Sequence, residues 1–403
     1  MSRGLGDVYK RQTFTNAGTI GLGLRAASKI CSIQEGGAGL SNIRFIQDNA
    51  TGLVPKAVCA RSKAELAENS FLEFSESVLV YYCPALLGEK IFRKDFSRKL
   101  PQNLKQKVSI PAKDLLKNNN SLENKKLMPV KAALALGGFA IPLIEYTLNY
   151  AKNIMTLKMF KQADFENIAN LNKTKNEDKT QFDKVEKSAK KHIKLAGGIY
   201  AGCLAFAGLL LSKGEKSKAL QNLSELIVAP GTKLFKNNSK ARNFFDKFLS
   251  LDFANDNGKL SLSRGQLTSC VLVGGAGYFG SSKDRGKQNY LETLSRYPIV
   301  GFYIIYGNEL LEKGFKKFLY NTGKCKDVLN EKLEVPRFDE LKEYSKKFGE
   351  NADVMYKKML KQKVLIAGLP LVFGIGVIGF FITKSANLFT KFRYNKENQN
   401  KTK

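Results

Sequence analysis

Residues 364–383 read VLIAGLPLVFGIGVIGFFIT, a run of 20 residues without a charged side chain. A helix that crosses the hydrocarbon core of a bilayer needs about 20 predominantly apolar residues. The glycines and Pro370 in this run would weaken a soluble helix, but such residues are frequent in membrane helices. We therefore predict a membrane-spanning helix here. The alternative is a fully buried helix in the core of a large soluble protein.

The residues after this run form a short basic tail. Lys384 follows directly, and Glu397 is the one acid among the cations of the last twenty residues. Positive charge beside a membrane helix favours the cytoplasmic side, because cytoplasmic loops and tails carry an excess of Lys and Arg. We therefore expect a protein of the inner, or cytoplasmic, membrane with its C-terminus in the cytoplasm.

Two further runs have the length and composition of membrane helices. Residues 132–150 read AALALGGFAIPLIEYTLNY and contain one charge, Glu145, while residues 195–212 read LAGGIYAGCLAFAGLLLS and contain none. Three shorter apolar runs, at 77–88, 267–281 and 298–311, have a length more typical of buried, re-entrant or interfacial segments. We predict an all-α, multi-pass membrane protein with three to five spans, basic loops and amphipathic helices.

One shorter run also contains a glycine motif. Residues 271–282 read VLVGGAGYFGSS, in which Gly275, Gly277 and Gly280 follow a β-branched run. The stretch resembles the opening of nucleotide-sugar epimerases of the extended short-chain dehydrogenase family. The resemblance implies a strand–turn–helix unit that binds NAD, with Tyr320 and Lys324 at the spacing of the family's catalytic pair.

The surroundings of this motif favour a membrane helix instead. A dinucleotide fingerprint needs a helix after the glycines and an acidic residue at the end of a second strand. Here the polar run SSKDRGKQN follows, and Glu292 lies in a polar stretch. In a helix, the small residues at 270, 274, 277 and 281 would share one face, which a neighbouring helix could approach closely.

The charge of the chain predicts anionic partners. Lys and Arg number 66 against 36 Asp and Glu, a formal net charge of +30. Lysines beside membrane segments attract anionic lipid headgroups, so we expect membrane lipids as partners, with protein partners also compatible. A soluble nucleic-acid-binding protein is an alternative, although nucleic acid is the less favoured partner because the chain has none of the aromatic-studded strands that bind single-stranded RNA.

Few residues point to catalysis. The cysteines are widely spaced and His192, the single histidine, stands between lysines. This pattern lacks the spacing of a zinc site or a disulfide framework. We therefore predict reduced, structural thiols, a solvated His192, no catalytic or metal site and no cofactor, so that the chain is not expected to be an enzyme.

Glu145 is the best candidate for a functional group. Ionisable residues inside membrane helices are costly, and they often line a cavity or pair across helices. We predict an intramembrane polar site formed by Glu145 with Asn308 and Glu309, and with Lys131 and Glu312 as further possible partners. Such a site would suit a small-solute transporter or channel, which is the alternative to a structural or interaction component at an anionic lipid surface. Glu145 also lies near the end of its run, where it could simply reach the headgroups.

The remaining expectations concern the organisation of the chain. Asp7–Gln12, DVYKRQ, matches the translation of a transposon-end adapter used in sequencing libraries, so residues 1–12 are expected to be an adapter-derived leader.

An amphipathic helix is predicted near residue 340, because apolar side chains recur at helical spacing at Phe338, Leu341, Tyr344 and Phe348. Gly349 is expected to end this helix. We divide the chain into segments 1–12, 13–126, 127–212, 213–266, 267–320, 321–363 and 364–403.

Overall fold

The computed structural model describes residues 21–32, 49–83, 88, 90, 92–117, 121–172, 177–256 and 259–401. The expected leader at 1–12 and residues 84–87 of one short apolar run lie outside these ranges. The described residues are almost entirely helical, which confirms the all-α class, and they form two compact units. The smaller unit comprises residues 1–36 with 306–374, and the larger unit comprises residues 37–305 with 375–403.

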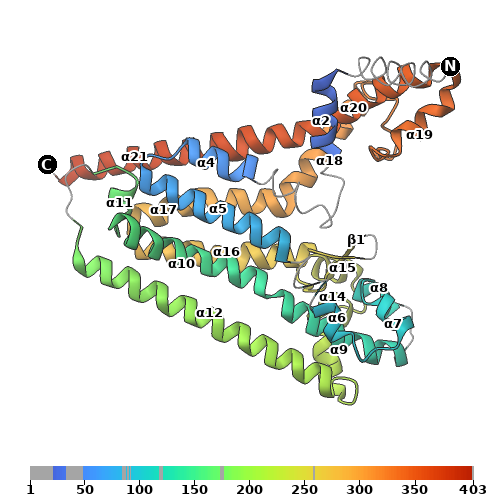
Figure 1. Cartoon of the computed structure of the whole chain (residues 1–403), viewed down its shortest axis with the longest axis horizontal. Helices are drawn as coiled ribbons and strands as arrows, with labels where there is room; N and C mark the ends of the chain where they lie inside the picture. The colour runs from blue at the N-terminus through green and yellow to red at the C-terminus, as the bar shows by residue number, and fades with distance from the viewer. Residues whose placement is uncertain are drawn as a thin grey trace, which may run out of the picture. The chain divides into compact units, whose positions relative to one another are not determined.

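The larger unit contains most of the helices and one short antiparallel hairpin (Figure 1). Its elements are η3 (Asn49–Leu53), α4 (Val54–Val58), α5 (Lys63–Cys83), α6 (Arg93–Phe96), α7 (Gln102–Lys107), α8 (Ala112–Lys117), α9 (Ser121–Gly138), α10 (Ala140–Phe160), α11 (Phe165–Ile168), α12 (Lys179–Lys213), α13 (Lys218–Val228), α14 (Pro230–Leu234), α15 (Ser239–Phe248), β1 (Ala254–Asp256), β2 (Lys259–Ser261), α16 (Arg264–Asp284), α17 (Lys287–Phe302) and α21 (Ile382–Lys401).

The smaller unit is also helical. Its elements are α2 (Leu22–Ser32), α18 (Asn308–Asn321), α19 (Leu341–Ser345), the 3₁₀ turn η6 (Lys346–Asn351) and α20 (Ala352–Phe373). Two π-helical segments, η5 (Tyr303–Gly307) and η7 (Gly374–Phe381), lie where the chain passes from one unit to the other. π-helical turns are rare and interrupt the regular hydrogen bonding of an α-helix.

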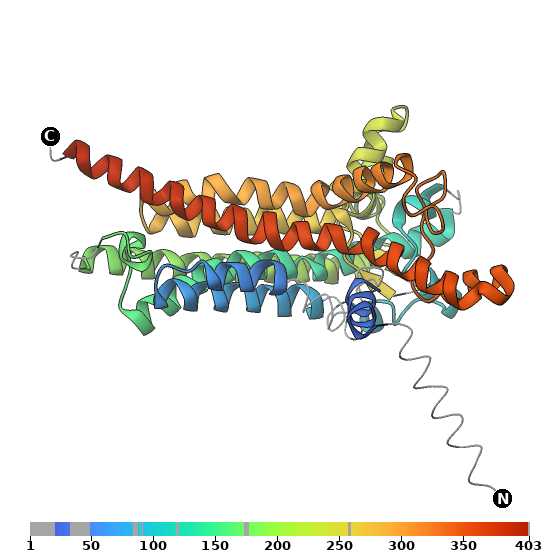
Figure 2. The same ribbon diagram turned by 90° about the horizontal axis from the view of Figure 1, so that it is seen from above.

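Helix α10 is the centre of the larger unit. It packs against α5, α12 and α16, while α17 packs against α16 and α21 (Figures 1 and 2). Local signals define the helix starts: the Asp178 side chain accepts a hydrogen bond from Thr180 N at the start of α12, and Ser263 and Gln266 form a capping box at the start of α16. These contacts satisfy backbone donors that a helix N-terminus leaves unpaired.

A hydrophobic core lies where α9 meets α7, α8 and α13. Leu127, Met128 and Val108 are fully buried there, together with Leu210 from the end of α12. Lys131 enters the same core and donates hydrogen bonds to Val108 O at 2.8 Å and to Asp252 Oδ1 at 2.9 Å. Burial raises the pKa of the Asp252 carboxyl, an effect that Lys131 and the Ala112 N–H oppose.

The glycine motif lies inside one continuous helix. Residues 271–282 form the middle and end of α16, which has no strand before the glycines. A Cβ on Gly277 would lie 2.8 Å from the Cα and O atoms of Tyr146, and one on Gly275 would lie 2.7 Å from the Tyr297 ring. The glycines therefore allow α16 to approach α10 and α17 closely, as the helical interpretation predicts, and the arrangement excludes a dinucleotide-binding turn here.

The smaller unit packs α2, α18 and α19 against α20. Its buried core includes Leu319, Leu341 and Met359, with Phe338 packed against it. The predicted amphipathic helix through residue 348 is wrong in its second half. Helix α19 ends at Ser345, and Gly349 adopts a positive φ of 57°, which no α-helix contains. Tyr344 and Phe348 are consequently exposed.

The close contact between α10 and α16 leads to a first prediction. Gly277→Ala should lower the stability of the protein by about 1–3 kcal/mol, because the new methyl group overpacks against the Tyr146 backbone. Gly202→Ala on α12 is the matched control, since a Cβ there meets nothing within 4 Å. Alanine is the better helix former, so the control should leave stability unchanged or raise it slightly. Thermal unfolding in detergent, followed by circular dichroism, measures both; equal melting temperatures would contradict the packing described.

Candidate functional site

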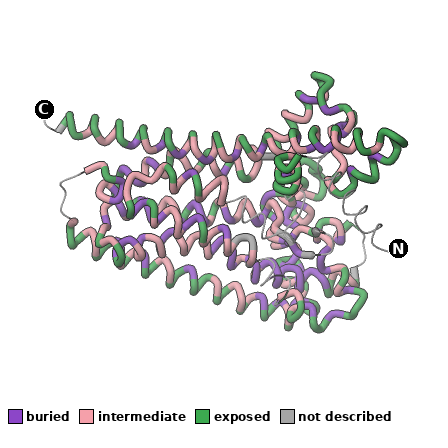
Figure 3. The backbone as a smooth tube through the Cα atoms, turned by 45° about the horizontal axis from the view of Figure 1, so that its top comes forward, coloured by how far each residue is buried: buried purple, intermediate pink, exposed green. Residues whose placement is uncertain are grey.

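Three helices among the described residues are long and apolar enough to cross a membrane: Leu122–Phe160, Lys179–Lys213 and Leu341–Asn400. The most apolar 18 residues of the first are 83% buried inside the protein, whereas those of the second and third are only 17% and 22% buried. The first span is broken at Phe139 between α9 and α10. The second and third therefore expose their apolar surface, as Figure 3 shows for α12 along its lower edge.

Side-chain hydrogen bonds join neighbouring helices within their apolar parts. Tyr200 of α12 donates a hydrogen bond to Gly137 O at 3.2 Å, next to the break between α9 and α10. Tyr297 of α17 donates to Val271 O of α16 at 2.7 Å. The apolar runs of four helices are together called the apolar belt. They are residues 140–150 of α10, 195–212 of α12, 267–281 of α16 and 298–302 of α17.

Glu145 lies within this belt, at the contact between α10 and α16. It is partly buried, and a Cβ on Gly274 would lie only 2.6 Å from its Oε2 atom. The Cys270 thiol and the Tyr297 hydroxyl lie close enough to the carboxylate for an electrostatic interaction. Glu145 thus faces a neighbouring helix.

The structure does not bring the other residues of the predicted polar site to Glu145. Glu309 and Asn308 begin α18 in the smaller unit, and the Asn308 side chain lies outside the described part. The pairing of Glu145 with these two residues therefore stays a prediction. Lys131 pairs with Asp252 instead, and Glu312 pairs with Lys316 one turn along α18 at 2.6 Å.

A buried ionic network along α5 is the most concentrated group of charges in the larger unit. Helix α5 carries four of these charges. Glu65, Glu68 and Glu73 are buried, and Glu76 is partly buried. Arg61, in the turn before α5, bridges Glu65 at 2.6 Å and Glu292 of α17 at 2.9 Å. Both carboxylates are less than a tenth exposed, so the network joins α5 to α17 away from water.

Arg285 forms the second link of this network. Its side chain is 1% exposed and contacts Glu68 Oε1 at 2.5 Å, just after the end of α16. Glu68 also accepts a hydrogen bond from Thr156 of α10. The Glu68 carboxylate of α5 therefore contacts both α10 and the residue that follows α16. Further along α5, Glu73 pairs with Lys56 of α4.

The network continues toward Glu145 through aromatic side chains. Tyr278 of α16 donates to Glu76 at 3.4 Å, and the Lys152 ammonium lies 5.3 Å from the centre of the Tyr278 ring. Cations are attracted to aromatic faces at such distances. Charged and polar groups thus follow the α5–α10–α16 contact from the end of the bundle to the apolar belt.

His192 is placed differently from the prediction. Its Nδ1 shares a hydrogen bond with the Tyr146 hydroxyl, and its ring stacks on Tyr150 with centroids 4.4 Å apart. His192 is therefore packed between α10 and α12 rather than simply solvated. The packing of His192 is not evident from the sequence, because the neighbouring lysines indicate an exposed face.

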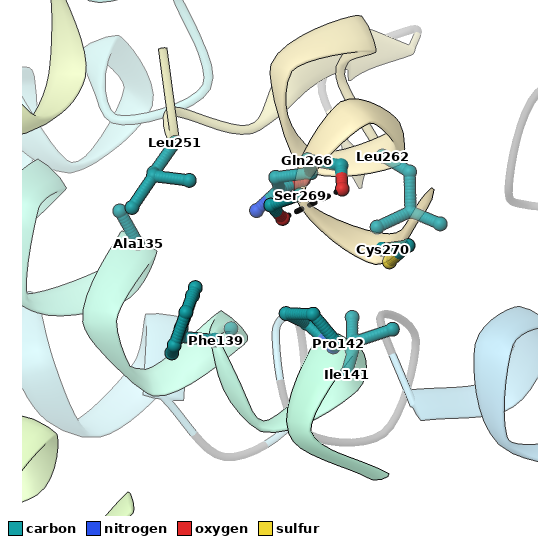
Figure 4. A pocket seen from close by; sticks show the side chains of 10 residues that line it. Ala135, Phe139, Ile141, Pro142, Leu251, Leu262, Gln266, Ser269 and Cys270 are labelled. Carbon is teal, nitrogen blue, oxygen red and sulfur yellow. Dashed lines mark hydrogen bonds between the residues drawn. The ribbon is translucent and has the colours of Figure 1, made fainter. Parts of the chain in front are cut away.

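A small crevice lies beside the break between α9 and α10 (Figure 4). Apolar side chains such as Phe139, Ile141 and Leu251 line most of it, and Gln266, Ser269 and Cys270 supply its polar atoms. Gln266 is 4% exposed, and its Nε2 atom has no hydrogen-bond partner. A buried unsatisfied donor is costly, and this amide lies beside Gly138 at the end of α9.

Cys59, Cys203, Cys270 and Cys325 form no disulfide bond with another described cysteine, and no group of three or more His, Cys, Asp or Glu within the described ranges has the geometry to hold a metal ion. No protein-family model, curated protein or solved structure matches this chain.

The ionic network leads to a second prediction. Arg285→Met should destabilise the protein by about 3–5 kcal/mol, because it leaves the buried Glu68 carboxylate without its cation. The double variant Glu68→Gln with Arg285→Met should recover much of this loss. Thermal unfolding in detergent measures the effect.

The matched control for this prediction is Lys287→Met. Lys287 pairs with Glu397 at 2.8 Å, but its side chain is 70% exposed. Exposed ion pairs contribute about 0–1 kcal/mol, so the control should change stability little. If Arg285→Met and Lys287→Met unfold at the same temperature, the buried pair does not stabilise the bundle.

Proposed function

We propose that this chain is an integral, multi-pass membrane protein that acts as a structural or interaction component at an anionic lipid surface. Its C-terminal tail lies on the cytoplasmic side of the inner membrane. The observation that carries the proposal is the apolar half of α12, which combines 18 uncharged residues with an exposed surface.

The exposed apolar surface extends beyond α12. Large apolar side chains are also exposed on other helices of the larger unit, for example Leu272 on α16 and Ile299 and Phe302 on α17. The run at 364–383 adds Val372 and Phe381, both more than three-fifths exposed. Soluble proteins rarely expose apolar surface this extensively, whereas acyl chains would cover it at no cost.

Polar segments flank the apolar parts in a manner that suits a bilayer. The first half of α12, before residue 195, carries most of its lysines, and α21 continues the 364–383 run into the basic tail. Each Lys or Arg near an anionic surface contributes about 1 kcal/mol of attraction. The lysine-rich composition thereby supports anionic lipid as the preferred surroundings.

The ionic network suits the same role. Membrane helices gain little from apolar contact with each other, since lipid tails are equally apolar, so packing of small residues and polar contacts between helices hold bundles together. Here the glycines of α16 supply the packing, and the pairs Arg285–Glu68 and Arg61–Glu292 supply the polar contacts.

A cysteine-labelling experiment tests the proposal at α12. Ile199→Cys and Thr180→Cys are made separately, with the six native cysteines changed to serine, and membranes of both orientations are treated with a membrane-impermeant maleimide. Ile199 is 43% exposed in the protein, yet lipid should exclude the reagent, so this thiol should react only after detergent is added. Thr180, in the polar half of α12, is the control and should react in one membrane orientation.

Alkaline carbonate washing of the same membranes completes the test. The chain should stay with the membrane pellet until detergent is added. Equal labelling of both thiols without detergent, together with release by carbonate, would contradict the proposal. Release by high salt alone would instead support a nucleic-acid-binding protein, whose affinity falls steeply as salt rises.

Transport of a small solute is the second candidate. It is favoured by one observation, the Glu145 carboxylate placed inside the apolar belt beside Cys270. It ranks second because Gly274 and Gly277 bring α10 and α16 into direct contact at this level. If transport is the function, Glu145→Gln should abolish solute flux into reconstituted vesicles while membrane insertion stays intact. Unchanged flux, with Asp114→Asn as a surface control, would remove Glu145 from any transport path.

A further inference from the structure

Helices α14 and α15 of the larger unit form a small basic and aromatic element, residues 230–249, which we call the arm. Between residues 233 and 249 the sequence has five cations, one acid and four phenylalanines. Phe245 packs on Phe235 with ring centroids 4.6 Å apart, and Phe248 is 8% exposed. The arm therefore has a small aromatic core of its own.

The acid of the arm, Asp246, is used to hold its two helices together. Its carboxylate accepts hydrogen bonds from Gly231 N at 2.7 Å, from Thr232 N at 3.0 Å and from Thr232 Oγ1 at 2.6 Å. Directly after the arm, the Ser250 hydroxyl donates to Val228 O of α13 at 2.6 Å. The arm is thus attached to the bundle at both ends, and its acid neutralises no cation at its outer surface.

The outer surface of the arm combines apolar and cationic side chains. Lys240 and Phe244 are four residues apart on α15 and therefore lie on one face of the helix. Both are exposed, and Phe244 is 49% exposed although it is one of the largest apolar side chains. Leu234 and Leu249, near the two ends of the arm, and Lys236 between its helices are exposed as well. Water solvates the lysines, but the apolar side chains gain free energy by leaving it.

The arm is attached near the point where the apolar run of α12 ends. Helix α13 follows α12, and Val228 at the end of α13 belongs to the same hydrophobic core as Leu210 of that run. The arm begins directly after α13, at Pro230. It lies on the far side of the bundle in Figure 1 and projects sideways from it, crosswise to the long helices, in Figure 2. With α12 in a bilayer, such an element meets the boundary between headgroups and acyl chains.

We infer that the arm is an interfacial anchor that docks on anionic lipid. Phe244 enters the boundary between headgroups and acyl chains, as the aromatic side chains of interfacial helices do. The stems of Lys236 and Lys240 lie along the apolar surface, and their ammonium groups reach the lipid phosphates. The excess of cations matches an anionic surface better than a zwitterionic one. The inference rests on the proposed membrane function, and it adds the segment through which the protein responds to lipid charge.

Fluorescence of the full chain in vesicles tests the docking. Phe244→Cys is made in the chain whose six native cysteines are changed to serine, and the new thiol carries a fluorophore that brominated acyl chains quench. The vesicles contain either phosphatidylcholine alone or equal parts of phosphatidylcholine and phosphatidylglycerol, with brominated acyl chains in both. The label at 244 should be quenched strongly in the vesicles with phosphatidylglycerol and much less in the others. Thr180→Cys, in the polar half of α12, is the control and should stay unquenched in both.

Two double variants of the Phe244→Cys chain test the role of charge. Lys236→Gln with Lys240→Gln should lower the ratio of docked to free arm about tenfold or more in the vesicles with phosphatidylglycerol, since each lysine near an anionic surface contributes about fivefold. Lys184→Gln with Lys187→Gln is the matched control, because it removes the same charge from exposed positions in the lysine-rich half of α12. Lys236→Arg with Lys240→Arg keeps the charge and should keep the quenching, which separates lost attraction from damage to the arm.

The same label on Ile199→Cys keeps the anchor and the membrane proposal apart. Quenching at 199 together with quenching at 244 that depends on phosphatidylglycerol supports both. Quenching at 199 with none at 244, or with equal quenching at 244 in both kinds of vesicle, overturns only the anchor. Quenching at neither position overturns both, and quenching at 244 alone supports the anchor but overturns the spanning helix. A label at 244 that is shielded from a water-soluble quencher in native membranes, yet not in vesicles of the purified chain, would assign the arm to a protein partner and overturn the anchor.

Discussion

A carboxylate that is withdrawn from water inside a helix bundle needs a cation or several hydrogen bonds beside it. This requirement shapes the larger unit, because α5 packs against α10 and its glutamates accept hydrogen bonds from side chains of α10 and α16. Arg285 neutralises Glu68, and Arg61 neutralises Glu65 and Glu292, so that residues 61–68 are joined to residues 285–292. The ends of the long helices are thereby fixed to one another, and the glycine contacts of α16 depend on that alignment.

The helical class and the long apolar segments follow from the sequence. Long uncharged runs are typical of membrane helices, and two such runs stand at 195–212 and 364–383. Both runs are helical, and both expose most of their apolar surface. The glycine run at 271–282 is also interpreted correctly as a helix, because the residues after it do not suit a nucleotide-binding unit. Its spacing of small residues predicts the close approach to α10 that the structure contains.

The ionic network could not be predicted in the same way. Arg61 lies 231 residues from its partner Glu292, Glu68 lies similarly far from Arg285, and each stands in a segment whose charges look like a solvated face. Only the packing of the helices brings these partners together. His192 presents the same difficulty, since its partners Tyr146 and Tyr150 belong to another helix. Helix α19 is shorter than predicted because the chain continues after Ser345 as a 3₁₀ turn, and the spacing of apolar residues does not distinguish the two kinds of helix.

Helix α12 is 35 residues long, so at about 1.5 Å per residue it extends roughly 52 Å. Its apolar half accounts for about 27 Å of this length, close to the thickness of a hydrocarbon core. In the proposed membrane the lysine-rich half then stands about 24 Å clear of the acyl chains as an unbroken rod. The Asp178 end of the helix is consequently held at a fixed height above the lipid, and the helix acts as a spacer between the membrane and that end.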